Sequence, residues 1–570
     1  MKKNYIYVVA SALVAVLMAG CNFLDKNPDM RATIDTKEKV QLLLVSAYTS
    51  ANYGPICEFS SDQIVDNNAP DKTGHCNSLS PLSKMYDEIF AWEAVKTDGE
   101  QDSPKYIWDA CYSAIATCNQ ALKAIAELEA QGINMDDEKG EALISRAYHH
   151  FILVNVFCHA WKDETQSKQD LGITYIKEPE TTVAPHYERG TVYETYKAIQ
   201  QDIEDAMPLV SDKYYSVPRY HFNVKAAHAF AARFYLYTRQ WDKVVQEANQ
   251  VLPADEESLV NVLYDASKGA VNDPEVEQLA WISPADPYNL LLNTTMSQAP
   301  YTVIPSYCRY MHNGSAADLS SLGSGPCWSG QFPGYPHWQY KQEYGTFCAK
   351  FLWLFEYTDK VNGYGYIHGV TRAFTTNETL LCRAEAKAML NDIDGAVNDL
   401  RLWCESYNGY SGRMDTLENG KVNLTLAKIK KFYRADTDFC PVLHNSDMSP
   451  EFIVTEEQMP LIWCVLHFRR IETVHDGLRW LDLKRYGIEI THQRGKEALR
   501  TLVWNDDRRA IQLPVDVRVA GMTPNPRVIV GDQVSPSSAV IASEPVGEIE
   551  PTTWPFIPSG VGISIHKNND

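Results

Sequence analysis

The sequence predicts a mostly α-helical fold, built from helix–turn–helix hairpins and interrupted by a large, irregular, loop-rich part. Apolar residues recur at helical spacing over several long stretches, and two of these stretches can be aligned with each other. The segment between the two is rich in Gly, Pro and aromatic residues and has no sustained period. With 570 residues, 45% of them hydrophobic, the chain can bury a large core.

Residues 1–20 are predicted to be a lipoprotein signal peptide. Lys2 and Lys3 precede an apolar run that is too short to span a membrane and ends in Leu-Met-Ala-Gly-Cys at residues 17–21. Such an ending is the lipobox pattern, in which Cys21 carries a diacylglycerol and acyl chains hold a soluble domain at a membrane surface. We expect an exported lipoprotein with a lipidated tether over residues 21–35. The alternative is a signal peptide cleaved elsewhere beside a chance cysteine.

After the tether, the helices can be placed in order. A first helix is expected from about Thr36, because Glu38 lies in its first turn and apolar residues follow at helical spacing. Residues 50–100 show little periodicity and are rich in Asn, Asp, Ser and Gly. Helical patterns then return from about Tyr106 and over residues 143–158, 192–209 and 223–252.

The last of these units has a second copy. Residues 376–404 align with residues 223–252 at an offset of 152, which superposes Ala232 on Ala384 and Asp242 on Asp394. Small residues on the first helix let the second pack closely, as in tetratricopeptide-like hairpins. The Asp392-x-Asp394-Gly395 stretch lies at the predicted turn and lacks the later Glu of a calcium loop, so we interpret it as structural.

Between the two copies lies an irregular insertion, at about residues 253–375. Residues 277–284 are predicted to form a short strand. Twelve of the 67 residues from Trp281 to Phe347 are aromatic, against 11% of the whole chain. Aromatic faces in such a loop suit the C–H faces of sugar rings, although they can also pack the loop together. The candidate ligand-binding residues are Trp328, Tyr335 and Trp338, with Trp92 after the first irregular region and Arg309 and Asn313 as hydroxyl partners.

Several classes of function are disfavoured. A formal net charge of −21 repels phosphate backbones, so we expect no nucleic-acid partner. There is no P-loop, GxGxxG, GxSxG, HExxH or C-x-x-C motif, and we expect no catalytic residue, cofactor or metal. Of the 13 cysteines, Cys57 with Cys76, or Cys308 with Cys327, could bridge within a loop.

Five segments resemble the SusD/RagB-like family of nutrient-binding outer-membrane lipoproteins. They are FLDKNPD at 23–29, Arg-Ala-Tyr at 146–148, Arg-Ala-Glu-Ala at 383–386, FRRIETVHDGLRWLDLKRYG at 468–487 and IQLPVDVRVAGMTPNP at 511–526. The fourth is the most specific, and it departs from the family pattern at Val474-His475-Asp476. The C-terminal extension at 527–570 continues beyond the usual end of the pattern and has no assigned role.

This resemblance implies a SusD-like helical domain over residues 36–526 with an irregular ligand-binding half. It also implies a non-catalytic, cell-surface protein that binds oligosaccharide and delivers it to a TonB-dependent outer-membrane β-barrel (SusC-like). We interpret the charged residues of 468–487 as buried or half-buried ion pairs that fix the fold.

Two other interpretations stay open. The same fold and partner could serve peptides, which also bind in aromatic clefts. A helical-repeat scaffold of the envelope would have an extended groove and no saturable small-ligand site. A surface glycosidase is the weakest alternative, because no catalytic motif supports it.

Overall fold

The computed structural model describes residues 34–530, apart from residues 71–73, 82, 97, 183–185, 267–273, 301–308, 313–322, 330–331, 333–336, 341–344, 349, 352–353, 409–413 and 435–438. Its α-helices are α2 (Lys37–Leu44), α3 (Gly54–Ser60), α4 (Lys84–Phe90), α5 (Pro104–Glu129), α6 (Asp136–Phe157), α7 (Val192–Ala206), α8 (Val224–Tyr237), α9 (Trp241–Val251), α10 (Glu256–Val260), α11 (Pro274–Trp281), α14 (Thr376–Met389), α15 (Ile393–Asn408), α16 (Leu426–Phe432), α17 (Asn445–Met448), α18 (Met459–Glu472), α19 (Leu478–Tyr486) and α20 (Val515–Val519). Within these residues, no helix combines the length and the apolar character that a bilayer span requires.

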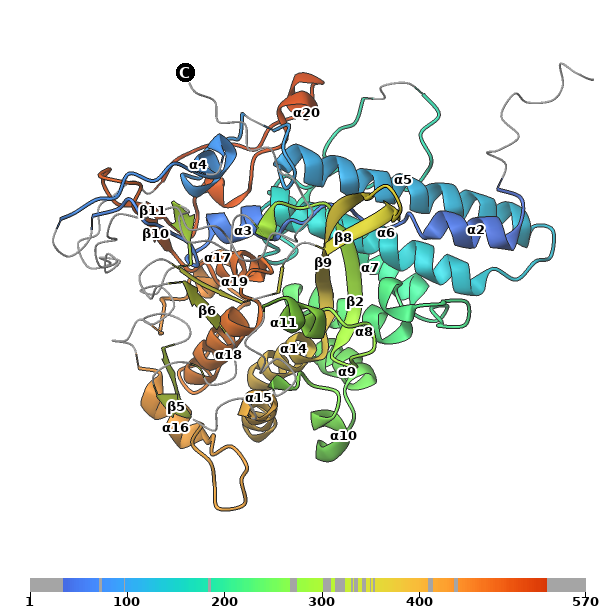
Figure 1. Cartoon of the computed structure of the whole chain (residues 1–570). Coiled ribbons are helices and arrows are strands. Elements are labelled where there is room, and N and C mark those ends of the chain that lie inside the picture. The colour runs from blue at the N-terminus through green and yellow to red at the C-terminus, as the bar shows by residue number, and fades with distance from the viewer. Residues whose placement is uncertain are drawn as a thin grey trace, which may run out of the picture.

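Packed helical hairpins form the body of the protein, as predicted. Helix α5 packs along α6, and α6 packs along α7. Helix α14 lies next to the α8–α9 hairpin, and it packs on α9, α15 and α18. Figure 1 shows α5 and α6 side by side, and α3, α4, β10 and β11 gathered at another side of the helical array. The mostly α-helical fold class is therefore confirmed.

The two aligned sequence copies have equivalent structures. Helices α8 and α14 both contain 14 residues, and α9 and α15 begin at Trp241 and Ile393, an offset of 152 residues. Each first helix is capped by a side chain, Asn223 for α8 and Thr375 for α14, which accepts a hydrogen bond from a backbone N–H of the first turn. The predicted repeat is confirmed at single-residue register.

The described strands are short and antiparallel. They are β1 (Val65–Asp66), β2 (Asn289–Thr295), β3 (Tyr310–Met311), β4 (Ser324–Gly325), β5 (Trp328–Ser329), β6 (His337–Tyr340), β7 (Gly345–Cys348), β8 (Leu354–Asp359), β9 (Tyr364–Thr375), β10 (Ile490–His492) and β11 (Arg500–Leu502). Strands β2, β9 and β8 form one sheet, and the remaining strands pair as β1–β3, β4–β5, β6–β7 and β10–β11. Most of the irregularity thus lies between α9 and α14.

The predicted strand at residues 277–284 is wrong. Residues 274–281 form helix α11, in which Glu277 and Gln278 are buried beside Trp281. A short apolar run that is buried on several sides does not reveal its period, so helix and strand cannot be separated by pattern alone. The first strand of the insertion is instead β2, which begins at Asn289.

The charged segment at 468–487 forms buried ion pairs, as interpreted from the sequence. Arg485 on α19 pairs with Glu385 on α14 at 2.9 Å and with Asp482 at 2.8 Å. Arg479 pairs with Asp62, which precedes β1, at 2.8 Å. These pairs join α14 and α19 to the N-terminal segment that leads into β1.

The cysteines in the described part of the chain are unlinked, including Cys57, Cys76 and Cys327. Cys308 lies outside the described residues. The pairing of Cys57 with Cys76 is therefore not formed. The Sγ atom of Cys327 instead lies 3.6 Å from that of Cys404 on α15.

Candidate functional site

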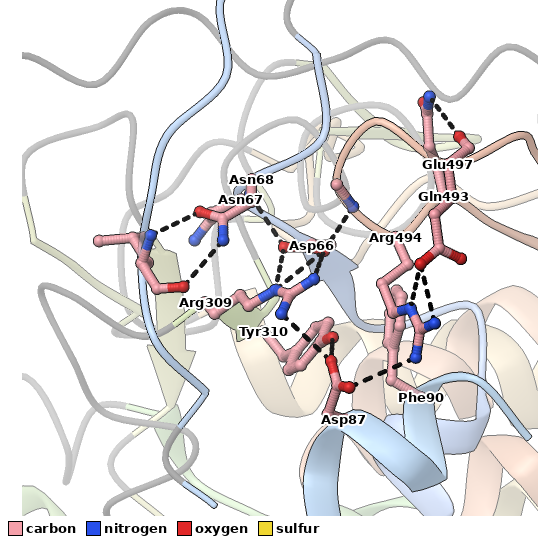
Figure 2. Close-up of polar contacts among 12 residues, drawn as sticks. Asp66, Asn67, Asn68, Asp87, Phe90, Arg309, Tyr310, Gln493, Arg494 and Glu497 are labelled. Carbon is pink, nitrogen blue, oxygen red and sulfur yellow. Dashed lines mark hydrogen bonds and ion pairs between the residues drawn. The ribbon is translucent and has the colours of Figure 1, made fainter. Parts of the chain in front are cut away.

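Four segments that are distant in sequence meet at one polar cluster, which we call the Arg309 cluster. It consists of Asp66, Asp87, Arg309, Arg494 and Glu497 (Figure 2). Strands β1 and β3 pair with Asp66 opposite Tyr310. This pairing brings Arg309, the residue before β3, beside Asp66.

Asp66 is the fixed centre of the cluster. Its carboxylate receives the guanidinium of Arg309 in a bidentate arrangement, with Nη2–Oδ2 at 2.8 Å and Nε 3.1 Å from both oxygens. Backbone N–H groups of Asn68 and Gly495 donate to it at 2.9 and 2.8 Å. Burial disfavours the charged form of Arg309, but the hydrogen bond to Asp66 outweighs this and raises the pKa of the guanidinium. The Arg309 guanidinium is therefore charged and held in one orientation by the bidentate contact.

Asp87 on α4 links the two arginines. Arg309 Nη1 lies 3.1 Å from Asp87 Oδ1, and Arg494 Nη1 donates to Asp87 Oδ2 at 3.3 Å. Arg494 in turn contacts Glu497 at 2.8 Å. Side-chain exposure is lowest at Asp66, at 0%, and 16% at Arg309. It is 26% at Asp87, 22% at Arg494 and 42% at Glu497. The row thus runs from the interior to the solvent.

Two asparagines after β1 fix the neighbouring loop. The side chain of Asn68 accepts from Leu79 N and donates to Leu79 O, both at 2.8 Å, and so imitates a strand partner. Asn67 donates its backbone N–H to Arg309 O at 2.7 Å and accepts at its own carbonyl from Asn77 Nδ2 at 2.7 Å. The loop from β1 to Leu79 is held against the cluster by these bonds.

A column of four stacked rings supports the cluster from below. Tyr310, Phe90, His492 and Trp92 follow one another with centroid separations of 4.4, 4.1 and 4.3 Å. Tyr310 donates its hydroxyl to Asp87, and burial together with this bond raises the pKa of Tyr310. All four rings are buried. The column therefore holds the Tyr310 hydroxyl in place, and this hydroxyl orients the carboxylate of Asp87.

The site residues that were predicted from the sequence lie in different environments. Arg309 belongs to the cluster. Trp92 is 5% exposed, stacks on His492 and donates its indole N–H to Ser60 O at 2.9 Å. Trp328 is also 5% exposed and packs against Phe332 and Phe468. Both indoles lie in the core and do not present the open aromatic faces that we expected.

The other predicted residues are outside what the structure describes. Asn313, Tyr335 and Cys21 lie among the residues that are not described, and Trp338 is described only as part of the backbone of β6, opposite Phe347. Their proposed roles stay predictions.

Sequence reasoning missed Asp66, Asp87, Arg494 and Glu497. The run Asp66-Asn67-Asn68 was visible as part of a polar region, but nothing in the sequence connects it with Arg309, 243 residues later. The Arg494 turn carries no motif that would single it out.

The arrangement offers rigid hydrogen-bonding groups of both signs. Guanidinium and carboxylate groups that are already paired keep further N–H donors and oxygen lone pairs for a polar ligand. Over the described ranges, no group of three or more His, Cys, Asp and Glu side chains is arranged to hold a metal ion. The groups of the cluster can therefore donate hydrogen bonds to a polar ligand and accept them from it.

Comparison with known proteins gives a family match over the N-terminal part of the chain and a fold. Residues 22–236 match the SusD-like family model described as "Starch-binding associating with outer membrane". A Bacteroides vulgatus protein named for a proposed sugar-binding role has 17% identity and a TM-score of 0.59, over 87% of this chain and 99% of its own. Two SusD superfamily proteins are also similar in structure. The one from Bacteroides vulgatus has 19% identity and a TM-score of 0.56, over 85% of this chain and 97% of its own. The one from Bacteroides fragilis has 15% identity and a TM-score of 0.54, over 85% and 98%. No curated protein sequence matches.

Proposed function

We propose that this chain belongs to the SusD-like family and binds an oligosaccharide at the Arg309 cluster. The family match supports carbohydrate as the ligand class and the outer membrane as the location. The row of alternating charges with graded exposure is the observation that carries the choice of site. The proposed role is binding, without catalysis.

The chemistry of the cluster suits sugar hydroxyls. A hydroxyl group both donates and accepts, so it can bridge a guanidinium and a carboxylate that lie next to each other. Asp87 and Arg494 form such a neighbouring pair, with side-chain exposures of 26% and 22%. Because the ion pairs and the ring column hold these groups in place, binding loses little side-chain entropy.

The aromatic residues of the insertion belong to the same proposal. Asn313 follows β3 by two residues, and Tyr335 and Trp338 lie further along the same insertion. We propose that these side chains supply the aromatic and amide contacts that Trp92 and Trp328, being buried, do not offer.

The proposed location rests on the N-terminal pattern, and the proposed partner rests on the family resemblance. We propose a signal peptide at 1–20, lipidation at Cys21, a tether to residue 35, the SusD-like domain at 36–526 and a C-terminal extension at 527–570. A soluble domain on such a tether can close over a membrane transporter. The proposed partner is a TonB-dependent, SusC-like β-barrel that receives the oligosaccharide.

Calorimetric titration of the mature chain, residues 22–570, tests the proposal. Starch, plant, host and microbial oligosaccharides are compared with mixed peptides. We expect saturable binding to one glycan class and a loss of tenfold or more in affinity for Arg494→Ala, because a hydrogen bond to a charged group contributes about 1.5–3 kcal/mol.

Lys139→Ala is the matched control. Lys139 forms a similarly exposed ion pair with Glu129, at 3.1 Å, near the α5–α6 turn. This variant should bind like the wild type. Binding to peptides alone would show that the protein serves peptide uptake. Equal glycan affinity of Arg494→Ala and wild type would show that the Arg309 cluster is not part of the binding site.

A further inference from the structure

A cavity lies among the helical hairpins, beside the turn between α8 and α9. It has a volume of about 430 Å³ and is bounded by the loop after α6, by α7, by the α8–α9 turn, by the end of α14 and by residues 451–452. Small-molecule sites typically measure about 300–1,000 Å³. The residues that line this cavity include none of the Arg309 cluster.

The two equivalent hairpins allow a direct comparison of the turn beside this cavity. In the α14–α15 hairpin the turn residues are Asn391, Asp392 and Ile393. In the α8–α9 hairpin the same positions hold Arg239, Gln240 and Trp241, and all three line the cavity. The first turn residue has a left-handed backbone in both hairpins, with φ values of 64° at Asn391 and 61° at Arg239.

The α14–α15 turn uses residues that favour this geometry. Asparagine tolerates a left-handed backbone better than arginine does. Asp392 accepts a hydrogen bond from Gly395 N at 3.1 Å, whereas Gln240 makes no side-chain cap for α9. The α8–α9 turn therefore departs from local preference at two adjacent positions, Arg239 and Gln240, and such departures are concentrated at functional sites.

Arg239 builds one wall of the cavity. Its guanidinium donates to the carbonyl oxygens of Lys162 and, at 3.3 Å, Trp161, and lies 4.0 Å from the centre of the Phe452 ring. These contacts fasten the loop after α6 to the α8–α9 turn. The cavity is thus held open by bonded neighbours.

The charges of the lining balance. Lys162, Lys197 and Arg239 face Asp163, Glu164 and Glu451. Two of the lysines are already engaged, since Lys197 pairs with Glu164 at 2.8 Å and Lys162 pairs with Asp170 at 2.9 Å. A cavity of this kind gives no net attraction to an ion of either sign.

The groups left for a ligand are one partly exposed indole and several acceptors. Trp241 has an indole N–H without a hydrogen-bond partner in the described part of the chain, and its ring lies 6.1 Å from that of Phe452. The carboxylate of Glu451 is exposed and unpaired among the described residues. An apolar ring face beside hydrogen-bond acceptors fits a pyranose, whose C–H face packs on the indole while its hydroxyls donate.

We propose that this cavity is a second ligand site, which binds a neutral, hydroxyl-rich molecule of monosaccharide or disaccharide size. Trp241 is the platform, and Glu451 and Asp163 accept hydrogen bonds from hydroxyls. The site is independent of the Arg309 cluster, and either site can bind without the other.

Fluorine NMR of the full mature chain labelled with 5-fluorotryptophan tests this site. The Trp241 resonance is identified by its absence in Trp241→Ile. The probes are maltose, cellobiose, xylobiose, mannobiose and lactose, with glycine betaine and glutamate as charged compounds of similar size. We expect a saturable shift of the Trp241 resonance with at least one disaccharide. No shift with any of the sugars, or a shift with the charged compounds alone, would overturn the proposal.

A double variant provides the binding control. Gln240→Asp with Trp241→Ile installs the residues of the α14–α15 turn, so we expect its melting temperature to equal or exceed that of wild type. In saturation-transfer NMR, the disaccharide signal that arises from this site should be at least tenfold weaker with the double variant than with the wild type. Unchanged binding in a folded double variant would contradict the assignment.

The Arg494→Ala variant separates this site from the proposed function. The Trp241 shift should persist in that variant. If the shift disappears there, the sugar acts through the Arg309 cluster and the second site is refuted. If the shift persists while no glycan binds the Arg309 cluster, the proposed function fails and the second site stands.

Discussion

Arg469 on α18 and Asp482 on α19 form an ion pair of 2.9 Å in which both side chains are completely buried. Asp482 also receives Arg485, and Arg469 lies 3.3 Å from Glu378 on α14. Burial disfavours the charged carboxylate of Asp482, but the two arginines outweigh this and lower its pKa. Three helices therefore meet at this charged centre, in which the segment at 468–487 supplies Arg469, Asp482 and Arg485.

Asp482→Asn should destabilise the protein by about 3–5 kcal/mol, because it leaves buried guanidinium charge without its counter-ion. Urea unfolding of the variant measures this change. Asp109→Asn removes an exposed partner of Lys105 and should change the free energy of unfolding by less than about 1 kcal/mol. Similar values for the two variants would contradict a structural role of the buried pair.

Glu58 on α3 should make stability depend on pH. Burial raises its pKa to about 8, against the hydrogen bond from Gly477 N at 3.0 Å. Between the ordinary pKa, near 4.5, and 8 the folded state holds a proton that the unfolded state has lost, so unfolding becomes easier as pH rises.

Glu58→Gln removes the titrating carboxyl group, so this contribution to the pH dependence of the unfolding free energy disappears. Relative to wild type, the variant should gain about 1.4 kcal/mol per pH unit across this window, as measured by urea unfolding at several pH values. A difference that stays constant with pH would show that Glu58 is not protonated in the folded state.

Tyr310→Phe should separate the ring column from the Arg309 cluster. The ring keeps its stacking with Phe90, but Asp87 loses the hydroxyl donor. We expect a loss of about 1 kcal/mol in stability and a several-fold weaker glycan affinity, measured by unfolding and by calorimetry. Tyr366→Phe removes an exposed hydroxyl that bonds Glu356 on the β8–β9 hairpin and should leave both quantities unchanged.

His492→Phe tests the hydrogen bonds within the column. The imidazole nitrogens lie 2.8 Å from Phe90 O and Ser61 O, and the ring stacks between Phe90 and Trp92. Burial lowers the pKa of His492, so the ring is neutral and its single N–H donates to one of these carbonyls. Phenylalanine keeps the stacking but removes that hydrogen bond, which should destabilise the protein by about 1–3 kcal/mol. A melting temperature equal to that of wild type would show that stacking alone holds the column.

Most of the helical array could be predicted from the sequence because its helices have one buried face. The pattern located α5 to α9 and the α14–α15 hairpin, and the 152-residue offset proved accurate at Trp241 and Ile393. Helices α3 and α4 were missed in the region judged aperiodic. All seven residues of α3 are buried, so no face of that helix alternates with solvent.

The candidate site was only partly predictable. Arg309 was chosen as a polar residue among aromatic ones, but its partners come from β1, α4 and the β10–β11 turn. Such contacts depend on how distant segments pack, which composition does not encode. Trp92 and Trp328 were chosen for their aromatic character, and the same character places them in the core.

The ring column joins residues that are synthesised at very different times, so it can form only after most of the chain has been made. Phe90 is made early, Tyr310 after half of the chain, and His492 only near its end. A nascent or clipped chain that stops before β10 holds Asp87 without Arg494 and Phe90 without its stacking partner on the His492 side. Contacts of such long sequence separation form late, after the local helical hairpins. The Arg309 cluster can therefore form only in a chain that extends at least to Glu497.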